Sequence, residues 1–267
     1  FRSILEFNAD TPTSLLEASV IQWQWKEDVF PECDQFNGIH EGLVQSWKDI
    51  FPKKGEIHFA GALENNEDTG TLQYLASTAM EAGFSTRVLD MQALDLQNGR
   101  FFDPAGELVN RCFKLYPWEW MVDESPDGCL AEMEWLEPIW KLVMSNKAIL
   151  ATLYELFPDS PYVLPCYLSR PRSGLFCKKP VFSREGHNVS VVDIRDWEEY
   201  VRIAETEGDY NTGAYVYQEY VEPTAYSGRY PVIGSWIIGG EAAGIGIREN
   251  RMEVTDNLSE FVPHIIG

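Results

Sequence analysis

The pattern of apolar and polar positions begins with a helical segment near the N-terminus. Hydroxyl residues beside a proline at positions 11–14 are typical of the start of a helix, and an amphipathic run follows over 15–26. Its apolar members are Leu16, Val20, Ile21 and Trp23. The residues before it, 4–8, have the composition of a strand end.

From position 56 the pattern changes to strand, helix and strand. These three elements are expected at 57–60, 69–81 and 84–89, with Gly83 as the helix stop. Their order predicts a βαβ unit of an α/β fold. The strand-to-helix loop, 64–68, is acidic, so it would repel a pyrophosphate and attract an amine.

The second half of the chain is punctuated by prolines. A helix is expected over 145–157, with Ser145 as its cap and Pro158 as its stop. A proline-spaced connector over 158–171 leads into a second lobe. Its expected elements are strands at 175–179, 189–192 and 214–221, a helix at 193–207, and a hairpin over 232–248 that turns at 239–240.

Length and composition are those of a folded protein without disulfide or metal staples. The chain has 267 residues, 45% of them hydrophobic, which favours two lobes and a full core. Five scattered cysteines with no C-x-x-C pair favour neither a zinc site nor a disulfide framework, so we expect a cytoplasmic location. The most apolar stretch, 232–247, contains Glu241 and is too short to span a bilayer. Because the chain lacks an initiator methionine and starts on a strand-like segment, we expect it to be N-terminally incomplete.

The net charge of −21 disfavours binding to nucleic acids or anionic membranes. Five of the 21 basic residues nevertheless fall in one short stretch: Arg170, Arg172, Lys178, Lys179 and Arg184. Surface salt bridges would explain this grouping, and so would a bound anion. In so acidic a protein we favour the anion.

A set of residues spread along the chain has the chemistry of a nucleotide site. It comprises Lys147, Lys179, the glycine-bearing loop 183–188, the pair Glu6 and Asn8, and Arg248. Lysines neutralise phosphates, carboxylate and amide oxygens bind Mg²⁺, and an arginine meets charge that develops on transfer. Each member also has an ordinary explanation: a solvated lysine, an edge-strand lysine, or a polar strand end. The common P-loop and dinucleotide-binding glycine motifs are absent, the four histidines are too dispersed for a site, and His58 is expected in a core strand.

The order of these residues resembles that in a known family. The matching segments are Glu6-Phe7-Asn8-Ala9-Asp10, Asn146-Lys147-Ala148-Ile149-Leu150, Lys179-Pro180 with Arg184 and Gly186, Tyr217-Gln218, and Ile247-Arg248-Glu249. In these segments the chain resembles the synthetase domain of glutathionylspermidine synthase and its stand-alone bacterial relatives, which are ATP-grasp ligases. The likeness covers nearly the whole chain, and the stand-alone branch is the nearer match.

The resemblance implies a permuted ATP-grasp fold, with a metal-binding strand and a preceding α/β substrate lobe in 1–140 and the ATP-grasp lobes in 141–267. It implies ATP and Mg²⁺ as cofactors and a reaction in which a carboxylate becomes an acyl phosphate and then an amide. The implied metal ligands are Glu6 and Asn8, and the implied catalytic residue is Arg248. The implied ATP-binding residues are Lys147, Lys179, Glu185, Gly186, Gln218, Glu219, Tyr220 and Val221. Of these, the last four are implied to read adenine through hydrogen bonds of their backbone.

The substrates are less well defined by the resemblance. Thr11, Thr13, Glu67, Asp68 and Arg184 match substrate positions of the family. By this resemblance, the candidate substrates are a peptide carboxylate such as glutathione and a polyamine. Leu115 departs from the family, which has a threonine there, and the chain lacks the arginine and the metal-binding aspartate that the family carries upstream of Glu6. Two alternatives stay open: a nucleotide-binding protein of the same fold without ligase activity, and an α/β scaffold with an empty cleft.

Overall fold

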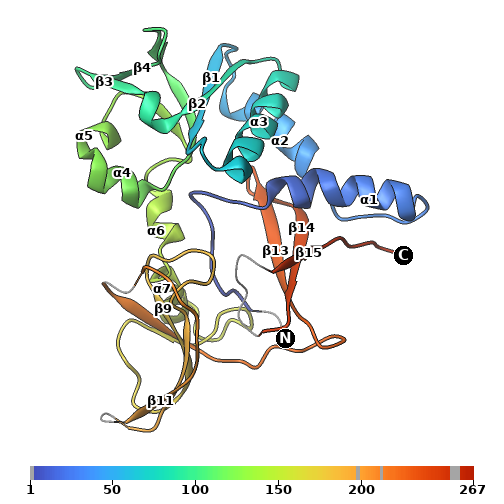
Figure 1. The fold of residues 1–267 in the computed structure, drawn as a ribbon, viewed down its shortest axis with the longest axis vertical. Helices are drawn as coiled ribbons and strands as arrows, with labels where there is room; N and C mark the ends of the chain where they lie inside the picture. Colours follow the sequence, from blue (N-terminus) through green and yellow to red (C-terminus); the bar gives the residue numbers. More distant parts are fainter. Residues whose placement is uncertain (1–2, 197–198, 211–212, 253–258) are drawn as a thin grey trace. The chain divides into compact units, whose positions relative to one another are not determined.

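The protein is a mixed α/β fold, seen here in a computed structural model that describes residues 3–196, 199–210, 213–252 and 259–267 (Figure 1). The chain forms two compact units, each built from separate stretches of sequence. The first unit comprises Phe1–Asn8, Val143–Val232 and Arg248–Glu260. The second comprises Ala9–Leu142, Ile233–Ile247 and Phe261–Gly267.

The second unit is organised around a parallel sheet of four strands in the order β2-β1-β6-β7. These strands are β1 (Glu56–Gly61), β2 (Ser85–Asp90), β6 (Arg111–Leu115) and β7 (Glu134–Leu136). A smaller antiparallel sheet consists of β3 (Asp95–Gln97), β4 (Arg100–Phe102) and β5 (Leu108–Val109). The helices are η1 (Glu17–Ile21), α1 (Gln22–Val29), α2 (Ile39–Ile50), α3 (Asn66–Glu81), η2 (Met91–Ala93), α4 (Trp118–Glu124) and α5 (Pro126–Cys129).

The main core of the second unit lies where α2 and α3 pack on β1 and β6. Trp47 of α2 meets Phe59 of β1 edge-on, with ring centroids 5.5 Å apart. Its indole N–H donates to Thr78 Oγ1 at 2.9 Å, which satisfies the one polar group of a fully buried ring. His58 is a buried residue of β1, as the sequence predicts.

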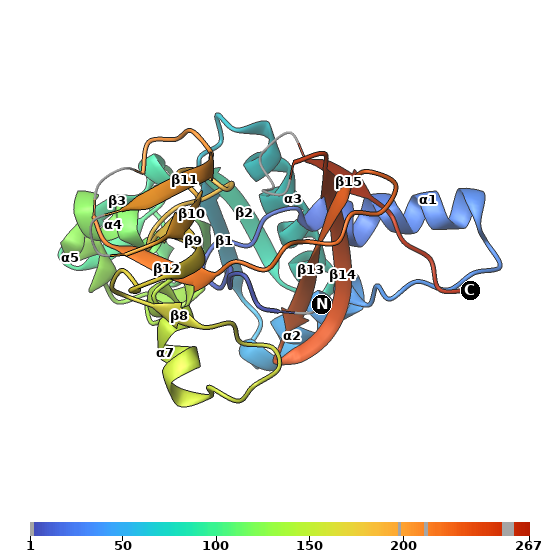
Figure 2. The same ribbon diagram turned by 90° about the horizontal axis from the view of Figure 1, so that it is seen from below.

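The first unit contains an antiparallel sheet of five strands in the order β11-β10-β9-β12-β8 (Figure 2). Its strands are β8 (Cys166–Tyr167), β9 (Gly174–Pro180), β10 (Ser190–Ile194), β11 (Tyr200–Glu205) and β12 (Tyr215–Glu219). Helix α6 (Lys141–Ser145) crosses the boundary between the units, and α7 (Ile149–Leu156) follows. The long hairpin strands β13 (Tyr230–Ile238) and β14 (Glu241–Asn250) join β15 (Glu260–Val262) in a fourth sheet, and Ile233–Ile247 of this hairpin belong to the second unit.

Most predicted elements are confirmed, and the βαβ unit is among them. Strands β1 and β2 pair in parallel with α3 between them, and the hairpin turns at Gly239 and Gly240 in the left-handed backbone region. None of the described helices is long and apolar enough to cross a membrane.

The helix expected over 193–207 is wrong. Residues 200–205 form β11, which pairs antiparallel with β10, Val192 lying opposite Arg202. Two positions of the expected helix, 197–198, lie outside the described residues. The many charged residues of this segment suggested a solvent-exposed helix. Every residue of β11 is indeed exposed, but its Tyr, Val and Ile residues favour a strand at a sheet edge.

The first helical segment also differs from its expected form. The run over 15–26 is a π turn followed by α1, and its buried positions are Leu15, Ala18, Ser19, Gln22 and Lys26. Val20, Ile21 and Trp23, assigned to the apolar face, are exposed. The extra residue in the π turn shifts the face that the α-helical period predicts.

Candidate functional site

Residues 3–8 form an extended segment held by side chains of the first unit, so the expected strand end is wrong. Gln218 Nε2 donates to the carbonyl oxygen of Ile4 at 2.9 Å. Lys179 Nζ donates to the carbonyl oxygen of Leu5 at 3.1 Å. Two residues that were predicted to bind nucleotide, Lys179 and Gln218, thus form hydrogen bonds to the backbone of the segment that contains Glu6 and Asn8.

Lys147 lies between α6 and α7, where the first turn of the expected helix 145–157 would be. Asn146 Oδ1 accepts the Ala148 N–H at 2.8 Å in the turn before α7, and the expected cap Ser145 is instead the last residue of α6. The Lys147 side chain is buried, and its Nζ donates to the Ser183 carbonyl at 2.6 Å. The same Nζ lies 3.4 Å from Glu6 Oε2.

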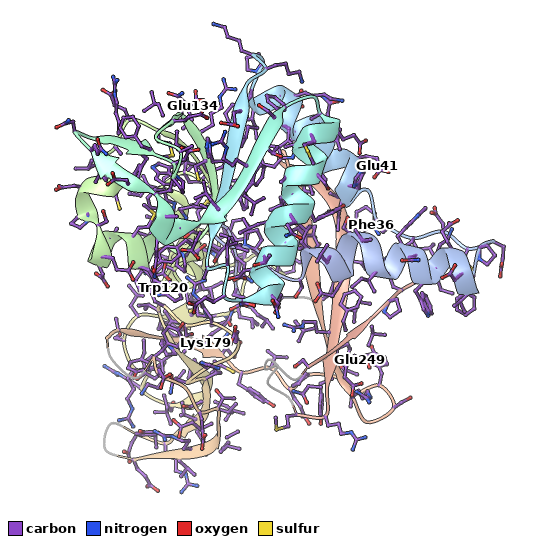
Figure 3. The ribbon with its side chains drawn as sticks, turned by 45° about the horizontal axis from the view of Figure 1, so that its top comes forward. Phe36, Glu41, Trp120, Glu134, Lys179 and Glu249 are labelled. Atoms are coloured by element: carbon purple, nitrogen blue, oxygen red, sulfur yellow. The ribbon has the colours of Figure 1, made fainter. Side chains whose placement is uncertain are left out.

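Lys179 is a buried residue of β9 (Figure 3). Its Nζ donates to Gln218 Oε1 at 2.8 Å. The neighbouring Lys178 places its Nζ 3.9 Å from the centre of the Tyr215 ring. Because successive strand residues face opposite sides of a sheet, only Lys179 shares a face with Gln218.

We name Glu6, Asn8, Lys147, Lys179 and Gln218 the two-lysine site. All five belong to the first unit. Desolvation acts to raise the pKa of Glu6, but the ammonium groups of Lys147 and Lys179 and the Asn8 hydrogen bond outweigh it, so this pKa lies below its ordinary value. Burial lowers the pKa of Lys147; Glu6 opposes this, while the like charges of Lys179 and Arg184 add to it. Buried cations held against one another form a site that an anion would stabilise.

The donor atoms of Glu6 and Asn8 fit a magnesium ion. Asn8 Nδ2 lies 3.4 Å from Glu6 Oε1, so the carboxylate and the amide share one side of the segment. The Glu6 side chain is 47% exposed and therefore open to a ligand. A carboxylate and an amide carbonyl are hard oxygen donors of the kind that Mg²⁺ prefers, with its remaining positions taken by water and phosphate.

The loop after β9 has a fixed backbone. Glu185 and Gly186 both have positive φ angles, 55° and 70°, and the His187 N–H closes a turn on the Arg184 carbonyl at 2.8 Å. Asn188 anchors the far end: its Nδ2 donates to the Gly208 carbonyl at 3.0 Å. The loop is thus built to present backbone groups beside the Ser183 carbonyl that Lys147 contacts.

The segment 218–221, which is expected to read adenine, comprises the last two residues of β12 and the two residues that follow. Glu219 N–H donates to the Pro165 carbonyl at 2.7 Å, and Tyr220 N–H to the Leu175 carbonyl at 3.0 Å. Two of its donors are therefore used within the protein. Arg248 lies in β14, and among the described residues it makes no ion pair with the members of the two-lysine site.

The candidate substrate residues lie mainly in the second unit. Glu67 and Asp68 occupy the first turn of α3 rather than a loop, so the boundary expected at position 69 is wrong. The Asn65 side chain caps this helix by accepting the Glu67 N–H at 2.9 Å. Carboxylates in a first turn are stabilised by the helix dipole, which gives both residues a structural role. Thr11 and Thr13 precede η1, and Arg184 belongs to the first unit.

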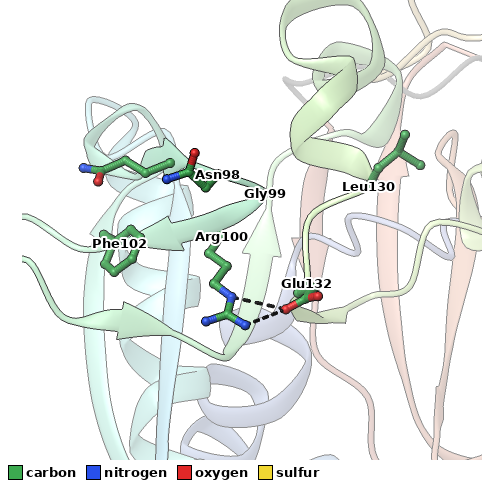
Figure 4. A pocket seen from close by; sticks show the side chains of 7 residues that line it. Asn98, Gly99, Arg100, Phe102, Leu130 and Glu132 are labelled. Carbon is green, nitrogen blue, oxygen red and sulfur yellow. Dashed lines mark hydrogen bonds and ion pairs between the residues drawn. The ribbon is translucent and has the colours of Figure 1, made fainter.

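The second unit also has a shallow concavity of about 550 Å³ beside β4 (Figure 4). Arg100 forms an ion pair with Glu132 at 3.0 Å across it. None of the predicted site residues lines it.

Two features of the site region escape sequence reasoning. The side chain of Gln218 was expected only to accompany an adenine-reading backbone, yet it contacts both Lys179 and Ile4. The second feature is Asp10, which lies in a segment that matches the family but had no predicted function. Its carboxylate pairs with the buried Lys114. A lysine between the apolar residues Phe113 and Leu115 of a strand was the available signal for that pair.

Comparisons with known proteins identify the family that this chain resembles. Residues 2–267 match the family described as "Glutathionylspermidine synthase preATP-grasp". A Haemophilus influenzae protein named "Putative acid--amine ligase" is 38% identical over 98% of this chain and 70% of its own length. The trypanothione synthetase of Crithidia fasciculata is 28% identical over 96% of the chain, and the bifunctional glutathionylspermidine synthetase/amidase of Escherichia coli 25% over 98%. The chain spans 43% and 47% of the lengths of these last two relatives.

A solved structure supports the fold. The crystal structure titled "Putative gamma-glutamylcysteine synthetase" from Methylobacillus flagellatus has a TM-score of 0.58 over 86% of this chain and 75% of its own, at 10% identity. The family match covers almost every residue, and the named relatives are ligases and synthetases. The chain therefore belongs to the glutathionylspermidine synthase family of ATP-dependent acid–amine ligases.

Proposed function

We propose that this chain binds Mg-ATP at the two-lysine site and forms an amide from a carboxylate and an amine, within a permuted ATP-grasp fold. The observation that carries the proposal is the convergence of Lys147, Lys179 and Glu6 on one short segment. The three residues are up to 173 positions apart in sequence, and no hydrophobic requirement explains two buried ammonium groups beside a carboxylate.

The lysines would hold the phosphates of ATP. Lys179 uses two of its three N–H groups, on Leu5 and Gln218, so one N–H remains for a phosphate oxygen. Lys147 is partly desolvated and would gain a second anionic partner besides Glu6. Glu185 and Gly186 would cover the phosphates with their backbone.

Glu6 and Asn8 would hold Mg²⁺, which supplies charge dispersal on the phosphates during transfer. The segment Gln218–Val221 would read adenine through its carbonyls and the Val221 N–H, since the donors of Glu219 and Tyr220 are already used. Arg248 would meet the transferred phosphoryl group. The substrate carboxylate attacks the γ-phosphorus of ATP, ADP leaves, and the amine then displaces phosphate from the acyl phosphate.

The names of the relatives point to the class of substrates. The names of the Crithidia fasciculata and Escherichia coli relatives contain trypanothione and glutathionylspermidine. A peptide carboxylate such as glutathione and a polyamine are therefore our candidate substrates. Thr11, Thr13 and Arg184 would contact the acid, and Glu67 and Asp68 the amine. We propose a cytoplasmic location, and the scattered cysteines of the sequence support it.

The departure at Leu115 has a packing explanation. Leu115 is 4% exposed and belongs to the core of the second unit, where its Cβ lies 3.4 Å from the position that a Cβ on Gly61 would take. A leucine fits this core, so its presence does not favour a protein that has lost ligase activity.

ADP formation by the full-length protein tests the proposal. We expect Mg²⁺-dependent ADP release that requires both a peptide acid and a polyamine, and that is lost in Lys179→Ala and Arg248→Ala. Lys178→Ala is the matched control, because Lys178 lies on the opposite face of the same strand. Turnover unchanged in both site variants would refute the assignment.

A further inference from the structure

We propose that Gln218 is a positioning residue: its side-chain amide fixes the metal-binding segment and orients Lys179 in a single arrangement. The inference rests on the proposed function of the two-lysine site and adds a role to a residue whose backbone alone was expected to act.

The position of Gln218 is rigid. It lies in the interior of β12, which pairs with β9 on one side and β8 on the other. Gln218 stands opposite Cys177 of β9 and Cys166 of β8, and it is 2% exposed. Lys179 pairs with Val216, two residues before Gln218 on the same face, and long side chains at such diagonal positions reach one another.

The two contacts of Gln218 require an amide. The Ile4 carbonyl needs a donor, and the amide nitrogen supplies it at 2.9 Å. The Lys179 ammonium needs an acceptor, and the amide oxygen supplies it at 2.8 Å. Glutamate would keep the acceptor and lose the donor, while methionine would keep the volume and lose both.

The segment that Gln218 holds joins no sheet over residues 3–8. In the part of the chain that the structure describes, Ile4 and Leu5 are held by hydrogen bonds to Gln218, to Lys179 and to the Tyr162 carbonyl, which accepts the Ile4 N–H at 2.9 Å. Glu6 follows directly after Leu5. The bond to Gln218 therefore sets where the metal-binding carboxylate lies relative to the phosphate-binding lysine.

Gln22→Met supplies a matched control for Gln218→Met. Gln22 is likewise a buried glutamine whose amide nitrogen and amide oxygen both form hydrogen bonds. Its Nε2 donates to the Ile245 carbonyl at 2.8 Å, and its Oε1 lies 2.9 Å from His264 Nδ1. It belongs to the second unit and has no part in the two-lysine site. Gln218→Met removes two side-chain hydrogen bonds from a buried amide, and Gln22→Met removes these two kinds of bond and a third, from Nε2 to the Ala18 carbonyl.

The first experiment measures the Mg²⁺ concentration at which ATP binding is half-maximal, by calorimetry on the full-length protein. Losing one or two buried hydrogen bonds should raise this concentration roughly three- to tenfold in Gln218→Met. Gln218→Glu should shift it in the same direction, because it loses the Ile4 bond. Gln22→Met should leave both this concentration and metal-free nucleotide binding unchanged.

A second readout needs no nucleotide. Amide hydrogen exchange in residues 3–8 should be faster in Gln218→Met and Gln218→Glu than in the wild type, and unchanged in Gln22→Met. If wild-type protein binds Mg-ATP but Gln218→Glu keeps both the metal dependence and the exchange rates, the positioning role is wrong. If wild-type protein does not bind Mg-ATP, the proposed function fails instead. Should Gln218→Met not fold, Gln218→Glu alone decides.

Discussion

Lys114 Nζ lies 2.5 Å from Asp10 Oδ1, and the two side chains are 0% and 1% exposed. The ammonium also donates to the Tyr116 carbonyl at 2.8 Å and lies 4.3 Å from the centre of the Trp118 ring. The second oxygen of Asp10 accepts the Trp118 N–H at 2.8 Å. This pair anchors the chain two residues after Asn8, and each charged group has its partners inside the protein.

Asp10→Asn should destabilise the protein by about 3–5 kcal/mol, because it leaves Lys114 charged and buried without its counter-ion. Burial already lowers the pKa of Lys114, and the Asp10 carboxylate opposes that effect. Denaturant unfolding measures the change. The double variant Asp10→Asn/Lys114→Met should lose less than the sum of the single variants. A cost below about 1 kcal/mol for Asp10→Asn would mean that the pair behaves like an exposed one.

The contribution of Glu6 to stability should depend on pH. The pKa of Glu6 in the folded protein lies below its ordinary value of 4.5, so between those two values the unfolded chain binds more protons. The contribution is therefore complete above pH 4.5 and is lost as the pH falls through the lowered folded-state pKa. Glu6→Gln should be less stable than the wild type at pH 7 and should approach it on acidification.

Unfolding curves of both proteins across this pH range give the comparison. Glu132→Gln, which removes an exposed carboxylate that pairs with Arg100, serves as the control and should change stability by less than about 1 kcal/mol. A difference between wild type and Glu6→Gln that stays constant with pH would show that the lysines do not stabilise the Glu6 carboxylate.

Gly208→Ala should displace the loop 183–188 that follows β9. A Cβ at this position would lie 2.5 Å from His187 Cβ and 2.8 Å from Asn188 Oδ1. Relief of this overlap requires the loop to shift, at about 1–3 kcal/mol in stability, and it should weaken ATP binding. The control is Gly234→Ala, whose new Cβ would meet only the Gly246 carbonyl at 3.7 Å. Equal ATP affinity in the two variants would show that the loop does not cover the nucleotide.

Glu67→Gln/Asp68→Asn tests the acceptor site. If these carboxylates hold the amine, its apparent KM should rise strongly in the full-length enzyme while ATP affinity stays the same. If they only stabilise α3, the unfolding free energy should fall by about 0.3–1 kcal/mol per residue and the amine KM should not change. Steady-state kinetics with varied polyamine separates these outcomes.

Local patterns predicted much of the fold. Strands β1, β2, β9, β10 and β12 and the hairpin were expected within a few residues of their observed bounds, because alternation and glycine stops are local signals. β11 was missed, since a strand at a sheet edge with no buried face carries no alternation of burial to read. The family assignment is confirmed by the match over residues 2–267.

The site residues were chosen from the sequence, but their arrangement was not predictable. The structure brings Glu6, Lys147 and Lys179 together, and their roles in binding remain predictions. The bonds of Gln218 to Lys179 and Ile4 join parts of the chain up to 214 positions apart. Such contacts depend on tertiary packing, which short-range periodicity does not encode.

Titration of Mg-ATP into the wild-type protein and into Lys147→Met and Lys179→Met tests the central claim most directly. We predict saturable binding by the wild type and its loss in both variants, with Lys178→Met binding as the wild type does. Lys147→Met loses the pair with Glu6 but also relieves the burial of the ammonium group and its repulsion by Lys179 and Arg184, so we expect this variant to fold. Wild-type affinity for Mg-ATP in folded Lys147→Met and Lys179→Met would contradict the account.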